Sequence, residues 1–243
     1  MLACNNISDT YKIKLIEKIK RTPTILSLRF SLSPAINFIP GQFLKVIFDE
    51  SNYNNQELNK NLSFSSSPLK DYIEITKRVS ESAFSQRLKG LEMGDRICIQ
   101  APRGQCTFND NYKKITFLIG GIGITPVISI LEYIQDKNLN TDTLLFYSNR
   151  TEEEIAFKEE LNQWQAKNPN LKVLYTITDF QPKDKNCLFG RIDKELVSRN
   201  IKDISERMFF IFGPPKMVEA MKGLCQAVGA KEEFIKTESF LGY

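Results

Sequence analysis

The hydrophobic pattern of this 243-residue chain changes its period near the middle. In the first hundred residues, short segments alternate between apolar and polar residues or run apolar, with Pro, Gly and Asn between them: residues 12–19, 25–32, 43–48, 72–78 and 95–100. A period of two, broken by turn residues, is typical of β-strands. Short strands at this spacing predict an antiparallel barrel or sandwich, with the Asn-rich residues 49–60 as a loop.

In the second half, short apolar runs alternate with longer amphipathic segments. The runs predict buried strands at residues 115–119, 143–147, 173–178 and 208–212, and the amphipathic segments predict helices at 124–135, 151–166, 193–199 and 214–229. Thr151 and Glu154 have the spacing of a capping box at the start of the second helix. Strand and helix in alternation predict a parallel sheet with right-handed crossovers. We therefore predict two domains, residues 1–110 and 111–243.

The chain contains no histidine, and this excludes several catalytic systems. Ser-His-Asp and Cys-His nucleophiles, His-ligated haem and His-based zinc sites all need that residue. The five cysteines (Cys4, Cys98, Cys106, Cys187 and Cys225) are irregularly spaced and form no Cys-x-x-Cys pair. A disulfide framework and an iron–sulfur cluster are therefore not expected. Chemistry at neutral pH must then come from carboxylates, from an unusual Lys or Cys, or from a bound cofactor, which is the common solution when a chain has so few reactive groups of its own.

Net charge and hydropathy limit the classes of partner and the cellular location that we expect for this chain. The formal net charge is +4, but the basic residues are scattered, so a nucleic-acid partner is not expected. A mild basic excess can still steer an acidic protein. The sequence has no apolar run of about 18 residues, so a membrane span is not expected. Residues 1–6 do not resemble a signal peptide. We expect a cytoplasmic location, where thiols stay reduced.

The motif with the clearest chemical meaning is Gly-Gly-Ile-Gly-Ile-Thr-Pro at residues 120–126. It follows a predicted strand and opens a predicted helix. Glycines at such a turn let the backbone approach a pyrophosphate, and the helix start offers free N–H groups. The last glycine of the general Gly-x-Gly-x-x-Gly pattern is missing, so a turn without a ligand is the alternative.

Four other segments combine polar, cationic or aromatic residues with turns. Residues 60–68 contain four serines; Lys77 and Arg78 precede the Ser-rich residues 82–85; residues 212–217 read Phe-Gly-Pro-Pro-Lys-Met; residues 238–243 contain three apolar residues around Gly. Cations beside a helix start can hold a diphosphate. Taken singly, each segment also fits a structural role: a polar strand, a solvated strand end, a helix start or an aromatic that packs on the core.

Taken in order, these five segments resemble the motifs of the ferredoxin–NADP reductase family of flavoproteins, over residues 12–243. The resemblance implies an N-terminal antiparallel six-stranded Greek-key β-barrel that binds FAD. It also implies a C-terminal Rossmann-like α/β domain with a parallel sheet that binds NADPH or NADH. FAD is expected to lie between the two.

On the flavin side, residues 60–63 are similar to the family motif Arg-x-Tyr-Ser. The resemblance implies that Ser63 contacts the flavin near N5. Lys60 replaces the Arg, and Leu62 replaces the Tyr that stacks on the isoalloxazine. The residues that this resemblance places around FAD are Lys60, Asn61, Leu62, Ser63, Thr76, Lys77, Arg78, Ala83, Phe84 and Ser85.

On the nucleotide side, residues 120–126 resemble the family motif Gly-Gly-x-Gly-x-Thr-Pro, and residues 212–217 resemble Cys-Gly-Pro-x-x-Met with Phe212 in place of Cys. The implied nucleotide-binding residues are Gly121, Gly123, Thr125, Asn149, Arg150, Gly213, Pro214 and Met217. Glu238 and Phe240 match a C-terminal Glu-x-aromatic whose ring covers the flavin, with residues 241–243 as a second possible cover. Ser63, Glu238 and Phe240 are the implied catalytic residues.

The resemblance implies hydride transfer from NADPH or NADH to FAD, followed by electron transfer to an acceptor. That acceptor is expected to be a ferredoxin-like or flavodoxin-like protein or an oxygenase component. A reductase of free flavin is an alternative that Lys60 and Leu62 favour, and a non-catalytic electron-transfer or regulatory subunit is one that Phe212 favours. Arg150 suits a 2′-phosphate, whereas residues 152–154, all Glu, oppose one, so the donor is open.

Overall fold

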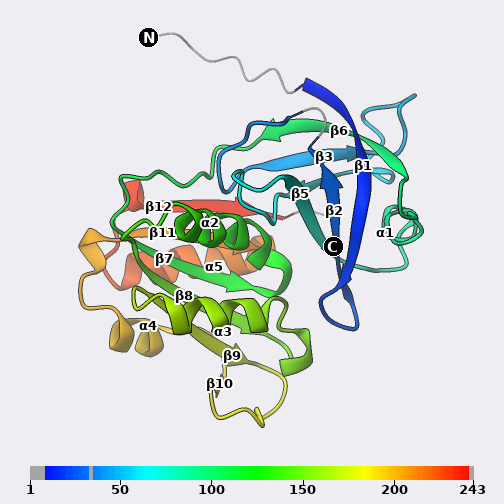
Figure 1. The fold of residues 1–243 in the computed structure, drawn as a ribbon. Coiled ribbons are helices and arrows are strands. Elements are labelled where there is room, and N and C mark those ends of the chain that lie inside the picture. The colour runs from blue at the N-terminus through cyan, green and yellow to red at the C-terminus, as the bar shows by residue number, and fades with distance from the viewer. Residues whose placement is uncertain (1–8, 33–34, 241–243) are drawn as a thin grey trace. The chain divides into compact units, whose positions relative to one another are not determined.

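The computed structural model describes residues 9–32 and 35–240. Contacts divide the chain into two units (Figure 1). One comprises residues up to 108 together with 125–136, and the other comprises 109–124 together with residues from 137 onward. The division into domains at residue 110 stays a prediction. Residues 241–243, expected as a second flavin cover, lie outside the described residues.

The first unit contains a six-stranded antiparallel sheet that curls into a near-barrel (Figure 1). Its strands are β1 (Asp9–Lys20), β2 (Ile25–Ser31), β3 (Phe43–Ile47), β4 (Asn59–Ser63), β5 (Tyr72–Arg78) and β6 (Arg96–Arg103). The order is β4-β3-β6-β1-β2-β5. Phe64, just beyond β4, bridges Ile75 of β5, so the two ends of the order meet. This confirms the predicted barrel architecture.

The interior of the near-barrel is apolar because every strand turns alternate residues inward. Ile13, Leu28 and Phe30 are among the side chains with no exposed area. Helix α1 (Ala83–Lys89) adds Phe84 and Leu88 to the same core. The core thus fixes the ends of β4 and β5 and the start of α1, where the flavin-side residues were predicted.

Helix α2 (Thr125–Asp136) belongs to the first unit by its contacts. The Glu132 carboxylate accepts a hydrogen bond from the main-chain N–H of Ser67 at 2.7 Å. Lys70 donates to Asp136 at 2.8 Å and lies 3.5 Å from Glu132. Burial raises the pKa of Glu132. These polar contacts join α2 to the turn between β4 and β5.

The second unit is built on a six-stranded parallel sheet. Its strands are β7 (Lys114–Gly120), β8 (Asp142–Asn149), β9 (Leu171–Ile177), β10 (Cys187–Phe189), β11 (Met208–Gly213) and β12 (Ile235–Ser239), in the order β10-β9-β8-β7-β11-β12. The central strands are buried on both faces and therefore read as continuous apolar runs. The predicted α/β sheet is confirmed. Strands β10 and β12 were not predicted. Strand β10 has only three residues, and β12 consists mostly of polar residues, none of which is fully buried.

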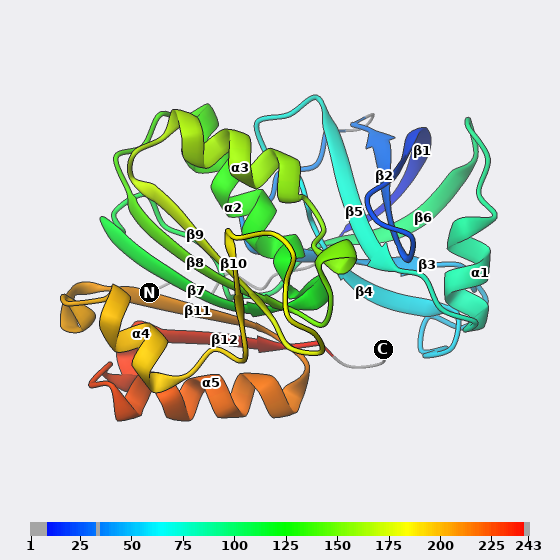
Figure 2. The ribbon, with the colours of Figure 1, turned by 90° about the horizontal axis from the view of Figure 1, so that it is seen from below.

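Helices cover both faces of this sheet (Figure 2). Helix α3 (Lys158–Lys167) lies on one face, and α4 (Lys194–Asn200) and α5 (Pro215–Ala227) lie on the other. Leu196, Val197 and Val218 from α4 and α5 pack on Phe146 and Ile211 of the sheet. Four short 3-10 helices complete the described elements: η1 (Gly121–Ile124), η2 (Glu152–Glu154), η3 (Ile204–Glu206) and η4 (Glu232–Phe234).

The helix predicted over residues 151–166 is interrupted. Thr151 makes no side-chain capping hydrogen bond, so the predicted capping box is wrong. Ile155 is extended, Phe157 has a left-handed φ of 60°, and α3 begins only at Lys158. Ile155, Ala156 and Phe157 are all buried. The extended Ile155 and the left-handed Phe157 both lie outside helical geometry, so α3 begins only after them.

No described helix is long and apolar enough to cross a membrane. The cysteines that the structure describes are buried free thiols: Cys98, Cys106, Cys187 and Cys225. The cytoplasmic location stays a prediction.

Candidate functional site

A buried carboxylate organises one face of the barrel unit. Glu74 of β5 is 2% exposed and accepts hydrogen bonds from Arg21 at 3.0 Å and from Arg29 at 2.7 Å. Arg29 also donates to Glu17 at 2.8 Å, nearer the surface. Opposite charges and hydrogen bonds of this kind are what a buried carboxylate requires.

The serine-rich segment after β4 is tied into this network. The Ser65 and Thr76 hydroxyls are 2.7 Å apart, and Thr76 is 2.6 Å from the Ser27 hydroxyl. The Ser66 hydroxyl accepts from the main-chain N–H of Glu74 at 2.9 Å. These hydroxyls are directed into the protein. Any contact of Thr76 with a cofactor would therefore fall to its main chain.

Four residues of β4 remain open to a ligand. Ser63 is 6% exposed, and none of the described residues hydrogen-bonds its hydroxyl. Leu62 is partly buried against the barrel core, beside its register partner Leu44. Lys60 is partly exposed, and Asn61 is exposed. The segment thus offers one buried hydroxyl, one apolar surface and one cation in a row.

Two ammonium groups approach each other here without an anion. Burial and, secondly, the positive charge of Lys60 lower the pKa of Lys77. Lys77 Nζ also lies 6.0 Å from the centre of the Phe84 ring. No described carboxylate forms an ion pair with Lys60 or Lys77. A bound diphosphate would relieve this repulsion, so these residues fit the FAD pyrophosphate.

The start of α1 lies next in sequence and presents hydroxyls. The Ser80 hydroxyl is 3.1 Å from the hydroxyls of both Ser82 and Ser85, and the Ser82 hydroxyl accepts a hydrogen bond from the main-chain N–H of Ser85 at 3.3 Å. Ala83 is exposed. Arg78, at the end of β5, donates to Thr24 at 2.8 Å. Phe84 is fully buried in the core, so its predicted role in binding would also fall to the main chain.

In the second unit, glycines allow very close packing at the carboxyl ends of β7 and β11. A Cβ on Gly123 would lie 2.3 Å from the carbonyl oxygen of Phe212. A Cβ on Gly120 would lie 2.3 Å from Met217 Sδ. Ligands of parallel α/β sheets bind outside the carboxyl ends of the strands. The glycines therefore let the backbone of η1 and of the ends of β7 and β11 pack closely at the edge where a dinucleotide would bind, and we call this backbone the glycine cradle.

The chain after β12 returns to this cradle. The main-chain N–H of Phe240 donates to the carbonyl oxygen of Gly213 at 2.9 Å. The rings of Phe212 and Phe240 are 6.4 Å apart, centre to centre. Phe212 has no exposed area, so the residue in place of the family cysteine is part of the core. Glu238 pairs in register with Phe212, and burial raises the pKa of Glu238 to about 7.

At the end of β8, one amide and one ion pair stand out. Asn149 is 4% exposed, and neither its side-chain nitrogen nor its oxygen has a hydrogen-bond partner among the described residues. Buried polar groups are usually paired, so this amide fits a bound ligand. Arg150 donates to Asp179, beyond β9, at 3.0 Å. Asp179 was missed, because nothing in the sequence links two residues 29 positions apart.

The remaining residues predicted to bind the nucleotide differ in burial and in backbone conformation. Thr125 is a buried first residue of α2, and Pro214 is exposed before α5. Gly121 has a left-handed φ of 52°. The structure thus brings Gly123, Gly213 and Phe240 together within one unit. The assignment of individual residues to FAD or nucleotide stays a prediction.

Two family models match the chain. The Oxidoreductase FAD-binding domain matches residues 12–108, and the Oxidoreductase NAD-binding domain matches residues 117–223. NADH-cytochrome b5 reductase 1 of Dictyostelium discoideum is 32% identical over 177 residues, which cover 71% of this chain and 62% of that protein. The protein of the same name from Debaryomyces hansenii is 27% identical over 97% of this chain and 84% of its own length.

Solved structures show the same fold. The cytochrome b5 reductase domain of Ulva prolifera nitrate reductase matches with a TM-score of 0.83 and 20% identity, covering 95% of this chain and 97% of that domain. A ferredoxin NADP+ reductase from Neisseria gonorrhoeae matches with a TM-score of 0.80 and 20% identity, covering 95% and 98%. Both matches extend across both units of the chain.

Proposed function

Since the chain belongs to the ferredoxin–NADP reductase-like family of FAD- and NAD(P)-binding oxidoreductases, we propose that it oxidises NADH and passes the electrons to a haem protein of the cytochrome b5 class. The sequence alone favoured a ferredoxin-like or flavodoxin-like acceptor. The names of the relatives from Dictyostelium discoideum and Debaryomyces hansenii support a b5-type acceptor instead. The net charge of +4 suits an acidic partner.

The observation that carries this proposal is the meeting of Gly123, Gly213 and Phe240 at the carboxyl edge of the parallel sheet. Glycine backbone there can approach a dinucleotide closely. The Phe240 ring lies beside Phe212 and gives the same place an aromatic wall. An aromatic surface beside a dinucleotide cradle is suited to a nicotinamide ring, which has to be held in line for hydride transfer.

The barrel unit would hold FAD. Lys60 and Lys77 would bind its pyrophosphate, and the Ser63 hydroxyl would hydrogen-bond the flavin ring. When bound, FAD supplies two-electron acceptance from a nicotinamide and one-electron release to a metal centre. Because Lys binds phosphate as a point charge, without the fork of Arg, Lys60 would fix the pyrophosphate less rigidly than the family arginine.

The donor we propose is NADH. The Arg150 guanidinium is 77% exposed, but its Nε is bonded to the Asp179 carboxylate at 3.0 Å. Asp179 would repel a 2′-phosphate and could accept a hydrogen bond from a ribose 2′-hydroxyl. Glu152 adds a second carboxylate in this region and accepts the main-chain N–H of Asp184. The local charge therefore favours the nucleotide without the extra phosphate.

The visible spectrum of FAD-loaded protein under anaerobic conditions tests the proposal. We expect a flavin band that NADH bleaches much faster than NADPH at equal concentration. Added ferricytochrome b5 should then be reduced with turnover, faster than ferredoxin under the same conditions. A protein that binds no FAD would overturn the family-level role. Bleaching without cytochrome b5 reduction would overturn only the acceptor, and faster bleaching by NADPH would overturn only the donor.

A further inference from the structure

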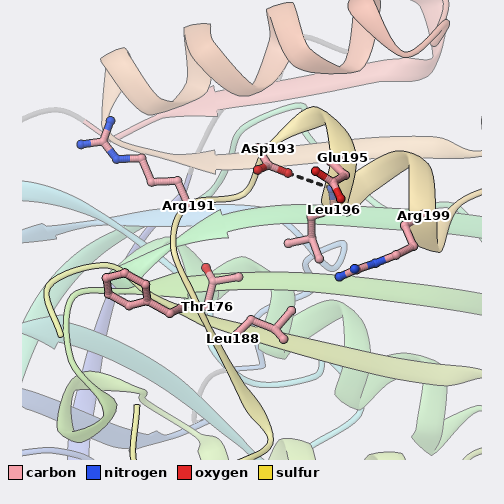
Figure 3. Close-up of a pocket in the computed structure, with 8 residues that line it drawn as sticks. Thr176, Leu188, Arg191, Asp193, Glu195, Leu196 and Arg199 are labelled. Atoms are coloured by element: carbon pink, nitrogen blue, oxygen red, sulfur yellow. Dashed lines mark hydrogen bonds between the residues drawn. The ribbon is translucent and has the colours of Figure 1, made fainter. Parts of the chain in front are cut away.

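Side-chain carboxylates at the helices accept main-chain N–H donors in two different ways. Asp193 lines a pocket beside strand β10, and its carboxylate accepts the N–H of Leu196 in the helix that it caps, α4, at 2.8 Å (Figure 3). Such a cap satisfies the first turn of one helix. Glu132 of α2 instead accepts the N–H of Ser67 at 2.7 Å, and Ser67 lies 65 positions earlier in the chain. The Glu132 carboxylate therefore fixes a segment outside its own helix.

The segment that Glu132 fixes continues directly from the flavin-side strand β4, which ends at Ser63. The main-chain N–H groups of Phe64 and Ser65 donate to carbonyl oxygens of the barrel unit at 3.2 and 2.8 Å. Backbone of the barrel thus fixes these two positions, whereas the N–H of Ser67 is held by a side chain of α2. Ser67 has no exposed area, so this bond is shielded from water. The position of α2 therefore affects the backbone that follows Ser63.

The bond between Glu132 and Ser67 has the features of a strong single contact. The Glu132 side chain is 17% exposed, and hydrogen bonds to an ionised acceptor are stronger than those between neutral groups. Lys70 Nζ lies 3.5 Å from the Glu132 carboxylate and donates to Asp136 at 2.8 Å. The two acids are four residues apart, so they lie on the same face of α2. Lys70 thus supplies the positive charge that keeps both carboxylates directed at the turn between β4 and β5.

The other end of α2 follows directly on the glycine cradle. The short helix η1 ends at Ile124, and α2 begins at the next residue, Thr125. By its contacts η1 belongs to the α/β unit and α2 to the barrel unit. The helix runs for about two turns from Thr125 to Glu132, and a rigid helix can transmit a displacement from one end to the other. A ligand bound at the glycine cradle would therefore act on the first turn of the helix that holds Ser67.

We propose that Glu132 is a positioning residue that couples nucleotide binding at the glycine cradle to the flavin site. The inference rests on the proposed function, in which the cradle binds a dinucleotide and the Ser63 hydroxyl contacts the flavin. When a nucleotide is bound, the first turn of α2 would shift, and Glu132 would transmit that shift to Ser67 and the backbone leading to Ser63. The flavin site would then bind FAD more tightly when the cradle is filled.

ADP-ribose tests this coupling in the wild-type chain, because it has the pyrophosphate of NADH but lacks the nicotinamide ring that could stack on the flavin. We expect saturating ADP-ribose to tighten FAD binding by about fivefold, measured by fluorescence titration. Loading with FAD should tighten ADP-ribose binding by the same factor, since coupling free energies are reciprocal. A chain that binds both ligands without coupling would overturn this inference alone. A chain that fails to bind either ligand would overturn the proposed function on which it rests.

Variants of α2 then test whether Glu132 transmits the coupling. Glu132→Ala removes the acceptor for the Ser67 N–H and should reduce the coupling factor to about one, with ADP-ribose still bound. Glu132→Gln keeps an oxygen that can accept this N–H and should restore most of the factor. Asp136→Asn is the matched control, because Asp136 lies on the same helix and bonds Lys70 rather than Ser67. A full factor in Glu132→Ala, or an equal loss in Asp136→Asn, would overturn the role of Glu132.

The amide of Ser67 gives a second measurement that needs no variant. In the FAD-loaded wild-type chain, ADP-ribose should shift the amide resonance of Ser67 more than that of Ser65, whose N–H donates to backbone of the barrel. This comparison decides the inference even if Glu132→Ala does not fold. A Ser67 amide that stays unchanged while ADP-ribose binds would overturn it.

Discussion

The two units hold their candidate binding residues in opposite ways. In the barrel unit, Glu74 is enclosed by Arg21 and Arg29, and the serine hydroxyls attach to the same network. In the α/β unit, Gly123 is packed so tightly against Phe212 that there is no room for a Cβ. The barrel unit thus depends on charged and hydroxyl groups that hydrogen-bond one another, whereas the α/β unit depends on the lack of a Cβ at Gly123.

This difference predicts opposite sensitivities. A polar network fails when a partner is removed, because the charges left behind stay buried without compensation. A glycine contact fails when an atom is added, because well-packed backbone moves only at a cost in free energy. Deletion should therefore damage the barrel site more, and enlargement should damage the dinucleotide cradle more.

The largest effect is expected from Glu74→Ala. The change leaves Arg21, which is 10% exposed, and Arg29 without their shared carboxylate. We expect the free energy of unfolding to fall by about 3–5 kcal/mol, measured by urea unfolding. Glu17→Ala is the matched control, because Glu17 is 50% exposed and pairs with the same Arg29. It should cost less than about 1 kcal/mol. Equal losses would show that burial of the network is unimportant.

Gly123→Ala tests the other half of the comparison. The added Cβ meets a backbone carbonyl oxygen at 2.3 Å. We expect a loss of about 1–3 kcal/mol of stability and a greatly slowed bleaching of bound FAD by NADH. Gly223→Ala is the control, because nothing lies within 4 Å of its Cβ in α5. That variant should gain up to about 1 kcal/mol. A Gly123 variant with normal stability and bleaching would break the comparison.

The pH dependence of stability tests the burial of Glu238 in the α/β unit. The pKa of Glu238 is raised to about 7 by burial, above the ordinary value of 4.5. Between these two values the folded chain binds more protons than the unfolded chain, so this residue makes stability fall as pH rises. We expect Glu238→Gln to remove about 1–3 kcal/mol of that fall between pH 5 and pH 7.5. Identical pH profiles of urea unfolding would show that the carboxyl is not desolvated.

Lys77→Gln tests the cation pair of the barrel site. Removing one of two unpaired ammonium groups should relieve repulsion in the protein without FAD and weaken binding of FAD. We expect FAD affinity to fall by about tenfold, measured by fluorescence titration, with no loss of stability in the absence of FAD. Lys89→Gln, an exposed cation at the end of α1, is the control. A parallel loss of stability would indicate that Lys77 has a structural role instead.

The smallest effect is expected from Asp179→Asn. The change frees Arg150 from its carboxylate and removes a charge that opposes a 2′-phosphate. An exposed pair contributes less than about 1 kcal/mol, so the ratio of kcat/KM for NADPH over NADH should rise by roughly fivefold. Glu153→Gln removes an exposed charge nearby and should leave the ratio unchanged. An unaltered ratio in Asp179→Asn would remove the basis for proposing NADH.

Much of the fold could be predicted from the sequence, because strand patterns of period two and buried apolar runs are local signals. Gly and Pro residues located the strand-to-helix turns at residues 120–126 and 212–217. The helix predicted at 151–166 begins only at Lys158, because Ile155 is extended and Phe157 has a left-handed φ, and neither conformation has a local sequence signal. The hydrogen-bond network of Glu74 could not be predicted from the sequence, because Arg21 and Arg29 lie 53 and 45 positions before Glu74.

The placement of α2 bears on how such enzymes can be recombined. The chain leaves the α/β unit after Ile124 and re-enters it at Lys137, and the helix between belongs with the barrel. A chimera joined at a single point near residue 110 would therefore take Glu132 and Asp136 from one parent, and Ser67 and Lys70 from the other. In the native chain these four residues contact each other directly. A working exchange of modules would need three junctions, so that residues 125–136 travel with the barrel from which they came.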